Sequence, residues 1–134
     1  MILTRGTEVT FGEFSRACDL VEAYFGETLD DVALDAPVSK RQLVAVLARV
    51  QLSSHRLMAD DLADAGDLVF ESDRETLCWL ERDLWSELQR EHNLAADENR
   101  AARAVHRRIV EAIDGTPERD RQPFVRIEQP IRYD

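Results

Sequence analysis

The residues that could do chemistry are few, and their spacing does not assemble a recognisable reaction centre. The three histidines, His55, His92 and His106, stand in no nucleophile-elbow pattern and no cysteine-protease signature. The five glycines are isolated, so no glycine-rich loop could cradle a phosphate group. The sequence predicts a protein that is not an enzyme and has no catalytic residues, cofactor or small-molecule substrate. An active site built from scattered residues would instead require a deep pocket where histidine and carboxylate side chains converge.

Metal binding is not predicted either. The best cation candidate is a group of acids in which Asp60 and Asp64 are one helical turn apart, but the glycine-bearing loop of an EF-hand is missing. We therefore interpret the group as a solvated acidic face. The two cysteines, Cys18 and Cys78, match no zinc spacing and indicate buried free thiols in a reducing compartment. The acidic group consists of Asp60, Asp61, Asp64 and Asp67.

The charge of the chain is unusual for its length of 134 residues. Twenty-seven acids face seventeen bases, a net charge of −10, and Lys40 is the single lysine. This bias is typical of a salt-adapted host, or of a GC-rich genome that favours arginine codons. Strong negative charge disfavours non-specific binding to nucleic acid or anionic lipid. With no long apolar run and no secretory signal at the start, we expect a cytoplasmic protein, or a component of a particle assembled there.

Hydrophobic periodicity and capping residues predict helices over most of the chain. Capping boxes at Thr10/Glu13, Ser39/Gln42 and Ser72/Glu75 mark three helix starts. The longest predicted helix spans 72–94, where leucines at helical spacing form one stripe. We predict an all-α fold, an irregular bundle of about five helices with short extended N- and C-terminal segments. The predicted helices cover approximately 11–25, 39–52, 53–65, 72–94 and 97–113.

The predicted core joins two stripes, and the chain is expected to divide near residue 115. Residues 1–115 form the predicted helical domain, and residues 116–134 form an extended, proline-containing tail. The acidic segment 27–37 is expected to be a connector with at most one helical turn. The core stripes are Phe11, Phe14, Cys18, Val21 and Phe25 in the first helix, and Leu77, Leu80, Leu84 and Leu88 in the longest one.

Several features predict contact with other protein subunits, or with further copies of this chain. Trp79 lies off the leucine stripe of its predicted helix, and exposed tryptophans are enriched at interface hot spots. An arginine face on the last helix could pair with a partner's carboxylates. Phe124–Ile127 could form a strand that adds to a partner's sheet. We therefore predict a non-enzymatic adaptor or assembly protein, for example one in a multi-subunit or viral assembly. Its predicted contact residues are Trp79, Arg100, Arg103, Arg107, Phe124, Val125 and Ile127.

A second hypothesis comes from residues 41–69, which read RQLVAVLARVQLSSHRLMADDLADAGDLV. The turn residues Leu47, Ala48, Leu52 and Ser53, and the exit residues Ala65, Gly66, Leu68 and Val69, resemble the helix-turn-helix core of winged-helix regulators. The resemblance implies a DNA-binding transcriptional regulator whose recognition helix presents Ser54, His55 and Arg56. It would also require a β-hairpin wing over 71–80, where the leucine spacing and the Ser72/Glu75 box predict a helix.

Overall fold

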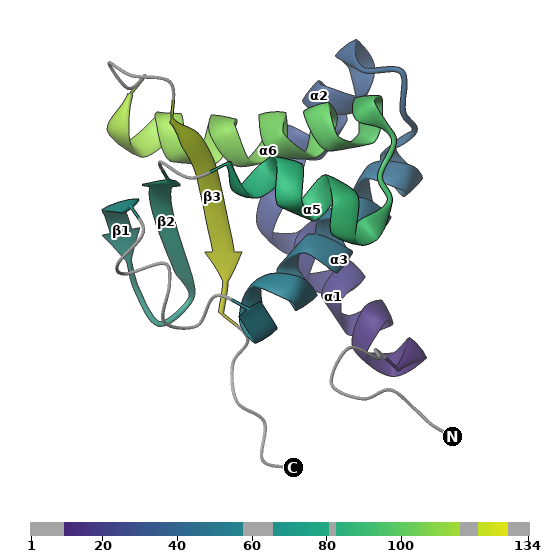
Figure 1. Ribbon diagram of the computed structural model, residues 1–134, viewed down its shortest axis with the longest axis horizontal. Helices are drawn as coiled ribbons and strands as arrows, with labels where there is room; N and C mark the ends of the chain where they lie inside the picture. The colour runs from purple at the N-terminus through teal and green to yellow at the C-terminus, as the bar shows by residue number, and fades with distance from the viewer. Residues whose placement is uncertain (1–9, 58–65, 81–82, 116–120, 129–134) are drawn as a thin grey trace.

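A computed structural model describes residues 10–57, 66–80, 83–115 and 121–128, without the side chains of residues 55–57 or the exposure of Gly66. Figure 1 shows a small sheet on one side of the helices, with α6 running across β3. The elements are α1 (Phe11–Phe25), α2 (Glu27–Asp35), α3 (Lys40–Leu57), β1 (Gly66–Glu71), β2 (Glu75–Leu80), α5 (Leu84–His92), α6 (Ala96–Asp114) and β3 (Gln122–Ile127).

The fold is α+β, so the prediction of an all-α bundle is wrong. The described residues include a three-stranded antiparallel sheet in the order β1-β2-β3, beside five helices. The strand β2 and the helix α5 lie where one long helix was predicted over 72–94. The strand β3 pairs along its length with β2, with Phe124 opposite Cys78 and Ile127 opposite Glu75. Residues 122–127 therefore belong to the sheet of the domain and not to an extended tail.

The error over 72–80 has two physical causes. The Ser72/Glu75 pair forms one of the two hydrogen bonds of a capping box, since Ser72 Oγ accepts the Glu75 N–H at 3.3 Å. The Ser72 N–H, however, donates to the Glu75 carbonyl at 2.9 Å, which closes a hairpin turn instead of opening a helix. The four apolar residues Leu77–Leu80 are all buried, and a strand buried on both faces has the same continuous apolar run as a buried helix segment.

The predicted caps at the N-terminal end of the chain are confirmed. Thr10 and Glu13 exchange side-chain and backbone hydrogen bonds at the start of α1, and Gly26 ends that helix with a φ of 47°. Ser39 and Gln42 do the same before α3. The acidic connector expected over 27–37 is wrong, since it forms α2 with Leu29 and Val32 buried.

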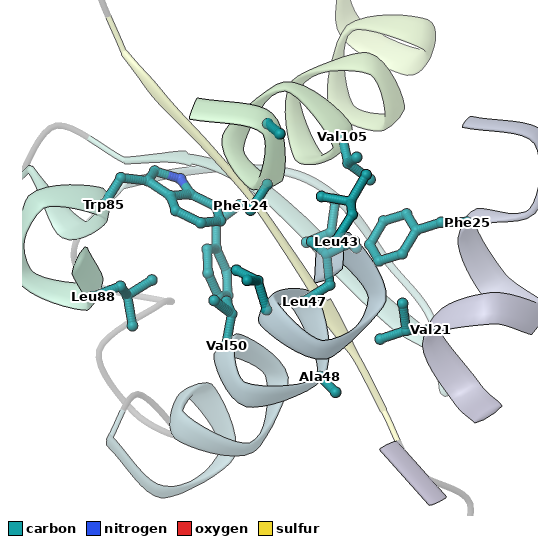
Figure 2. Packing of buried hydrophobic residues seen from close by; sticks show 14 of the residues in the cluster. Val21, Phe25, Leu43, Leu47, Ala48, Val50, Trp85, Leu88, Val105 and Phe124 are labelled. Atoms are coloured by element: carbon teal, nitrogen blue, oxygen red, sulfur yellow. The ribbon is translucent and has the colours of Figure 1, made fainter. Parts of the chain in front are cut away.

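The hydrophobic core lies between the helices and the sheet. Figure 2 shows Phe25 of α1 pointing toward Leu43 of α3, and Trp85 of α5 beside Phe124 of β3. The ring centroids of Trp85 and Phe124 are 5.9 Å apart. The predicted stripe of α1 is correct except at its first residue: Val21 and Phe25 are buried, Phe14 and Cys18 are partly buried against the core, and Phe11 is 86% exposed.

The free edge of β3 is closed by the side chain of Gln51, which projects from α3. Its Nε2 donates to the Val125 carbonyl at 2.7 Å, and its Oε1 accepts the Ile127 N–H at 2.8 Å. The buried amide therefore imitates a neighbouring strand, because it offers one donor and one acceptor in the positions where a ladder partner would.

Two further side chains complete this edge. His106 of α6 accepts the Val125 N–H on Nδ1 at 2.9 Å, and Trp85 Nε1 donates to the Pro123 carbonyl at 2.8 Å. Pro123 itself has no N–H to satisfy. These outward backbone groups of β3 are already bonded to side chains of α3, α5 and α6. The prediction that β3 adds to the sheet of a partner is therefore wrong.

Candidate functional site

Trp79 lies inside the molecule and not on a contact surface. Its side chain is 2% exposed, and its Nε1 donates to Asp114 Oδ2 at the end of α6 at 2.9 Å. The guanidinium carbon of Arg107 lies 5.9 Å from the centroid of the indole ring, within the range of a cation–π contact. Trp79 thus packs beneath Arg107 and bonds to Asp114 of α6, and its side chain is not available to a partner.

The other predicted contact residues divide between core and surface. Phe124, Val125 and Ile127 are buried in β3, so their side chains are occupied by the fold. The arginines of α6 remain at the surface, where Arg100 is exposed and both Arg103 and Arg107 are half-buried. The described structure therefore leaves the arginine face of α6 as the part of the predicted contact set that a partner can reach.

The predicted DNA-contact residues lie on one continuous helix, and not on the two helices and turn of a helix-turn-helix. Helix α3 continues from Lys40 to Leu57 without a turn at residues 52–54, and Ser53 and Ser54 are buried. Ser54 Oγ donates back to the Gln51 carbonyl at 2.8 Å, a bond made within the helix. His55 and Arg56 are helical, and their side chains lie outside the described structure. The hairpin that a wing would need is present as β1–β2.

The arginine face surrounds a shallow hollow on α6 of about 330 Å³. Ala104 is the one short side chain in its lining, among four arginines and Glu111. Arg100, Ala104 and Arg108 follow one another at steps of four residues, so they form one row along the helix. A second row contains Arg103, Arg107 and Glu111. Sequence reasoning missed Arg108, although the four-residue step from Arg100 through Ala104 was available to find it.

Three of the four guanidinium groups in this hollow pair with acids of the same chain. Arg107 lies 3.4 Å from Glu111, and Arg108 lies 3.8 Å from Asp31 of α2. Arg100 pairs with Asp97 one turn earlier. Solvent-exposed pairs of this kind are each worth about 0–1 kcal/mol, so a better carboxylate can displace the internal one.

Arg103 is the arginine of the hollow that has neither a hydrogen bond nor an ion pair among the described residues. It lies close enough to Asp83, the N-cap of α5, to help keep the pKa of that carboxyl below its usual range. The larger cause of that lowered pKa is the hydrogen bond that Asp83 accepts from the Ser86 hydroxyl. Arg103 therefore has donors available for a ligand.

A second hollow of about 220 Å³ adjoins the first and shares Arg100, Ala104 and Arg108 with it. It lies between α6 and the segment that links α2 to α3. Figure 1 shows α2 next to α6. Val32, Ala36, Pro37 and Ala101 supply an apolar part of its lining, and Asp35 and Asp97 its acids. We call the two hollows together the α6 trough. It is basic at one end and mixed apolar and polar at the other.

A serine–histidine contact elsewhere in the molecule has the geometry of a nucleophile and its base. Ser53 Oγ lies 2.6 Å from His92 Nε2, and it also donates to Glu91 Oε2 at 3.4 Å. Acyl-transfer enzymes use such a pair to activate a hydroxyl group. Ser53 is buried, however, and neither hollow of the α6 trough includes it. The contact therefore joins the C-terminal ends of α3 and α5, and we assign it no chemistry.

His106 is a fully buried titratable group among aromatic rings. Its ring packs against Trp85 at 4.8 Å and Phe124 at 5.0 Å between centroids. This burial lowers the pKa of His106 to about 3 from an ordinary value of 6.5. Because Nδ1 accepts the Val125 N–H, the ring is neutral and carries its proton on Nε2. A neutral histidine bonded to a strand is structural.

Neither thiol is disposed for reactivity, and the described residues contain no metal-binding cluster. Burial raises the pKa of the Cys78 thiol to about 12. Burial, followed by the nearby Glu22 and Asp19 carboxylates, raises the pKa of the half-buried Cys18. No group of three or more His, Cys, Asp or Glu side chains in the described part of the chain is arranged to hold a metal ion. Within the same residues, no helix is long and apolar enough to cross a membrane.

Comparison with known proteins identifies the family. Residues 19–131 match the model of a family described as a domain of unknown function (DUF8048), and the chain belongs to that family. No curated protein and no solved structure matches this chain. The match includes α2, α3, the sheet and α6, so it contains the residues of the α6 trough.

Proposed function

We propose that this member of the DUF8048 family is a non-enzymatic adaptor that binds an acidic segment of another protein in the α6 trough. The observation that supports this most directly is the set of four arginines around Ala104 in a chain with a net charge of −10. A chain with that excess of acid repels acidic partners in general. A local basic hollow therefore makes attachment of an acidic segment specific to one place on the surface.

The chemistry of the four cations suits carboxylates. A guanidinium group donates two parallel hydrogen bonds to a carboxylate, which fixes orientation as well as charge. The internal acids Asp97, Asp31 and Glu111 already occupy some of these donors at the surface. A partner's carboxylates would replace them while leaving the backbone of α6 in place.

The apolar part of the trough extends the proposed ligand beyond a bare anion. Val32, Ala36 and Ala101 lie beside Arg100 and Arg108, within reach of the same bound segment. A peptide that carries apolar side chains between its carboxylates would bury them here. The proposed ligand is therefore an acidic and hydrophobic segment of a protein partner, in an assembly inside the cell.

Binding of a labelled peptide to charge-reversal variants tests the proposal. The probe is fluorescein-labelled Gly-Glu-Leu-Glu-Glu-Leu-Glu-Gly, measured by fluorescence anisotropy at low salt. We expect Arg103→Glu and Arg107→Glu each to weaken binding by about tenfold or more, because each replaces an attraction with a repulsion. Arg49→Glu is the matched control, since Arg49 is exposed on α3 near Cys18 of α1. Equal losses in all three variants, or no binding to the wild-type protein, would contradict the α6 trough as the site.

DNA binding of the winged-helix type is the second candidate, because the β1–β2 hairpin follows α3 as a wing would. Continuous helix through Ser53 and a buried Ser54 argue for the adaptor instead. Anisotropy of a labelled DNA duplex distinguishes the two. We expect no binding at moderate salt, whereas a regulator would bind the duplex and lose affinity in Arg56→Ala.

A further inference from the structure

The two edges of the sheet are treated differently by the rest of the molecule. The outer edge of β3 is closed by Gln51, His106 and Trp85, which bond its backbone groups from three helices. The outer edge of β1 has no such cover, since no backbone hydrogen bond joins β1 to any described segment other than β2. An uncovered strand edge offers a row of N–H and C=O groups to another chain.

The side chains of β1 include two large apolar groups at the described surface. Leu68 is 53% exposed and Phe70 is 43% exposed, and both rank among the few large apolar side chains at the described surface. A β-bulge separates them, so Leu68 pairs with Cys78 whereas Phe70 pairs with Leu77. Because Cys78 and Leu77 project to opposite faces of the sheet, the two exposed apolar side chains do so as well. A strand added at this edge would meet an apolar contact on each face.

Charge decides which kind of strand can occupy the edge. The hairpin residues 66–80 contain four acids, Asp67, Glu71, Asp73 and Glu75, against the single base Arg74. Pairing two copies of this chain through β1 would bring two such acidic hairpins together, and like charges on neighbouring strands are destabilising. The acids therefore disfavour self-association, and they favour a strand that carries bases.

We propose that the outer edge of β1 accepts a fourth strand from a partner protein, an extended basic segment with apolar residues between its basic ones. Backbone hydrogen bonds would supply most of the affinity, and lysine or arginine side chains near Glu71 would supply the selectivity, since Asp67 already pairs with Arg121. This site lies on a different element from the α6 trough and takes a partner of opposite charge, so it does not rest on the proposed function.

The test uses two synthetic peptides with the full-length protein. The first is acetyl-Gly-Lys-Val-Thr-Val-Lys-Gly-amide, and the second has glutamate in place of both lysines. Amide hydrogen exchange and ¹⁵N chemical shifts of β1 are followed at millimolar peptide. We expect the lysine peptide to slow exchange of alternate β1 amides by about tenfold or more, and the glutamate peptide to leave them unchanged.

Matched variants locate the effect. Leu68→Lys adds a base to the edge and should abolish the protection, whereas Leu34→Lys makes the same change at an 83% exposed position on α2 and should keep it. Arg103→Glu should also keep it, which separates this site from the α6 trough. Protection by both peptides alike, no protection by either, or a wild-type dimer in sedimentation that Leu68→Lys dissociates would overturn the proposal.

Discussion

Single residues in this protein connect the helices to the sheet, and His106 is the clearest example. It lies on α6, accepts a hydrogen bond from β3, and packs against the rings of α1, α5 and β3. Its identity as a buried residue was not apparent from the sequence, where it reads as one of three isolated histidines. Periodicity places a residue on a helix face, but it does not reveal that the facing group is an unpaired backbone N–H.

The environment of His106 predicts a pH-dependent loss of stability. Its pKa is about 3 in the folded protein and about 6.5 when exposed, so the unfolded chain binds the extra proton between these values. Stability should therefore be fully present above about pH 6.5 and should fall as the pH drops toward 3, by up to about 1.4 kcal/mol per pH unit. Urea unfolding at a series of pH values measures this slope.

His106→Leu provides the comparison for this experiment. The variant cannot take up the proton, but it leaves the buried Val125 N–H without its acceptor, which costs about 1–3 kcal/mol. It should be less stable than the wild-type protein at neutral pH, and the difference should shrink or reverse near pH 4. Parallel pH profiles for the two proteins would show that carboxylates, and not His106, cause the acid sensitivity.

At the scale of elements, capping residues predicted helix ends correctly where the local sequence is compatible with a helix alone. The boxes at Thr10/Glu13 and Ser39/Gln42 were correct, as was the end of the last helix near residue 113, because the same hydrogen bonds begin or end a helix in isolation. The pattern at Ser72/Glu75 was misleading because it closes a hairpin turn equally well. The choice there depends on β3, which lies more than forty residues further along the chain and pairs with β2.

The candidate site was predictable in part for the same reason. Arg100, Arg103 and Arg107 share one face of a helix that the sequence identifies correctly. The hollow at Ala104 and the contribution of α2 depend on tertiary packing that no periodicity encodes. Trp79 was mislocated because its position off the leucine stripe has meaning only if residues 72–94 are helical.

Because Gln51 attaches β3 to α3, we expect its substitution to lower the free energy of unfolding substantially. Gln51→Ala would remove both hydrogen bonds to β3 and leave the buried Val125 carbonyl without this donor. We expect a loss of about 2–4 kcal/mol in the free energy of unfolding, since each buried group left unsatisfied costs about 1–3 kcal/mol. Gln42→Ala is the control, because Gln42 is exposed and makes only a capping bond, so its loss should stay near or below 1 kcal/mol. Similar losses in both variants would mean that the edge of β3 is satisfied in another way.

At the scale of the whole molecule, the net charge and the local ion pairs have opposite effects on the stability of the folded state. The exposed pairs, such as Lys40 with Asp30 at 3.0 Å and Arg108 with Asp31 at 3.8 Å, join α2 to α3 and α6. Each contributes about 0–1 kcal/mol, and salt weakens it. The net charge of −10 acts in the opposite sense, because mutual repulsion of the excess acids destabilises the compact state until salt screens it.

Repulsion should prevail, so added potassium chloride should stabilise the fold. The Debye length is about 30 Å at 0.01 M, which spans the domain, and about 3 Å at 1 M. We expect the melting temperature to rise by about 5 °C or more over this range, measured by circular dichroism. Asp30→Asn and Asp35→Asn each remove one acid, but only the first also removes the pair with Lys40. Their difference in stability should be small at low salt and vanish at high salt. A melting temperature that falls with added salt would mean that ion pairs, and not excess charge, dominate the electrostatic free energy of this protein.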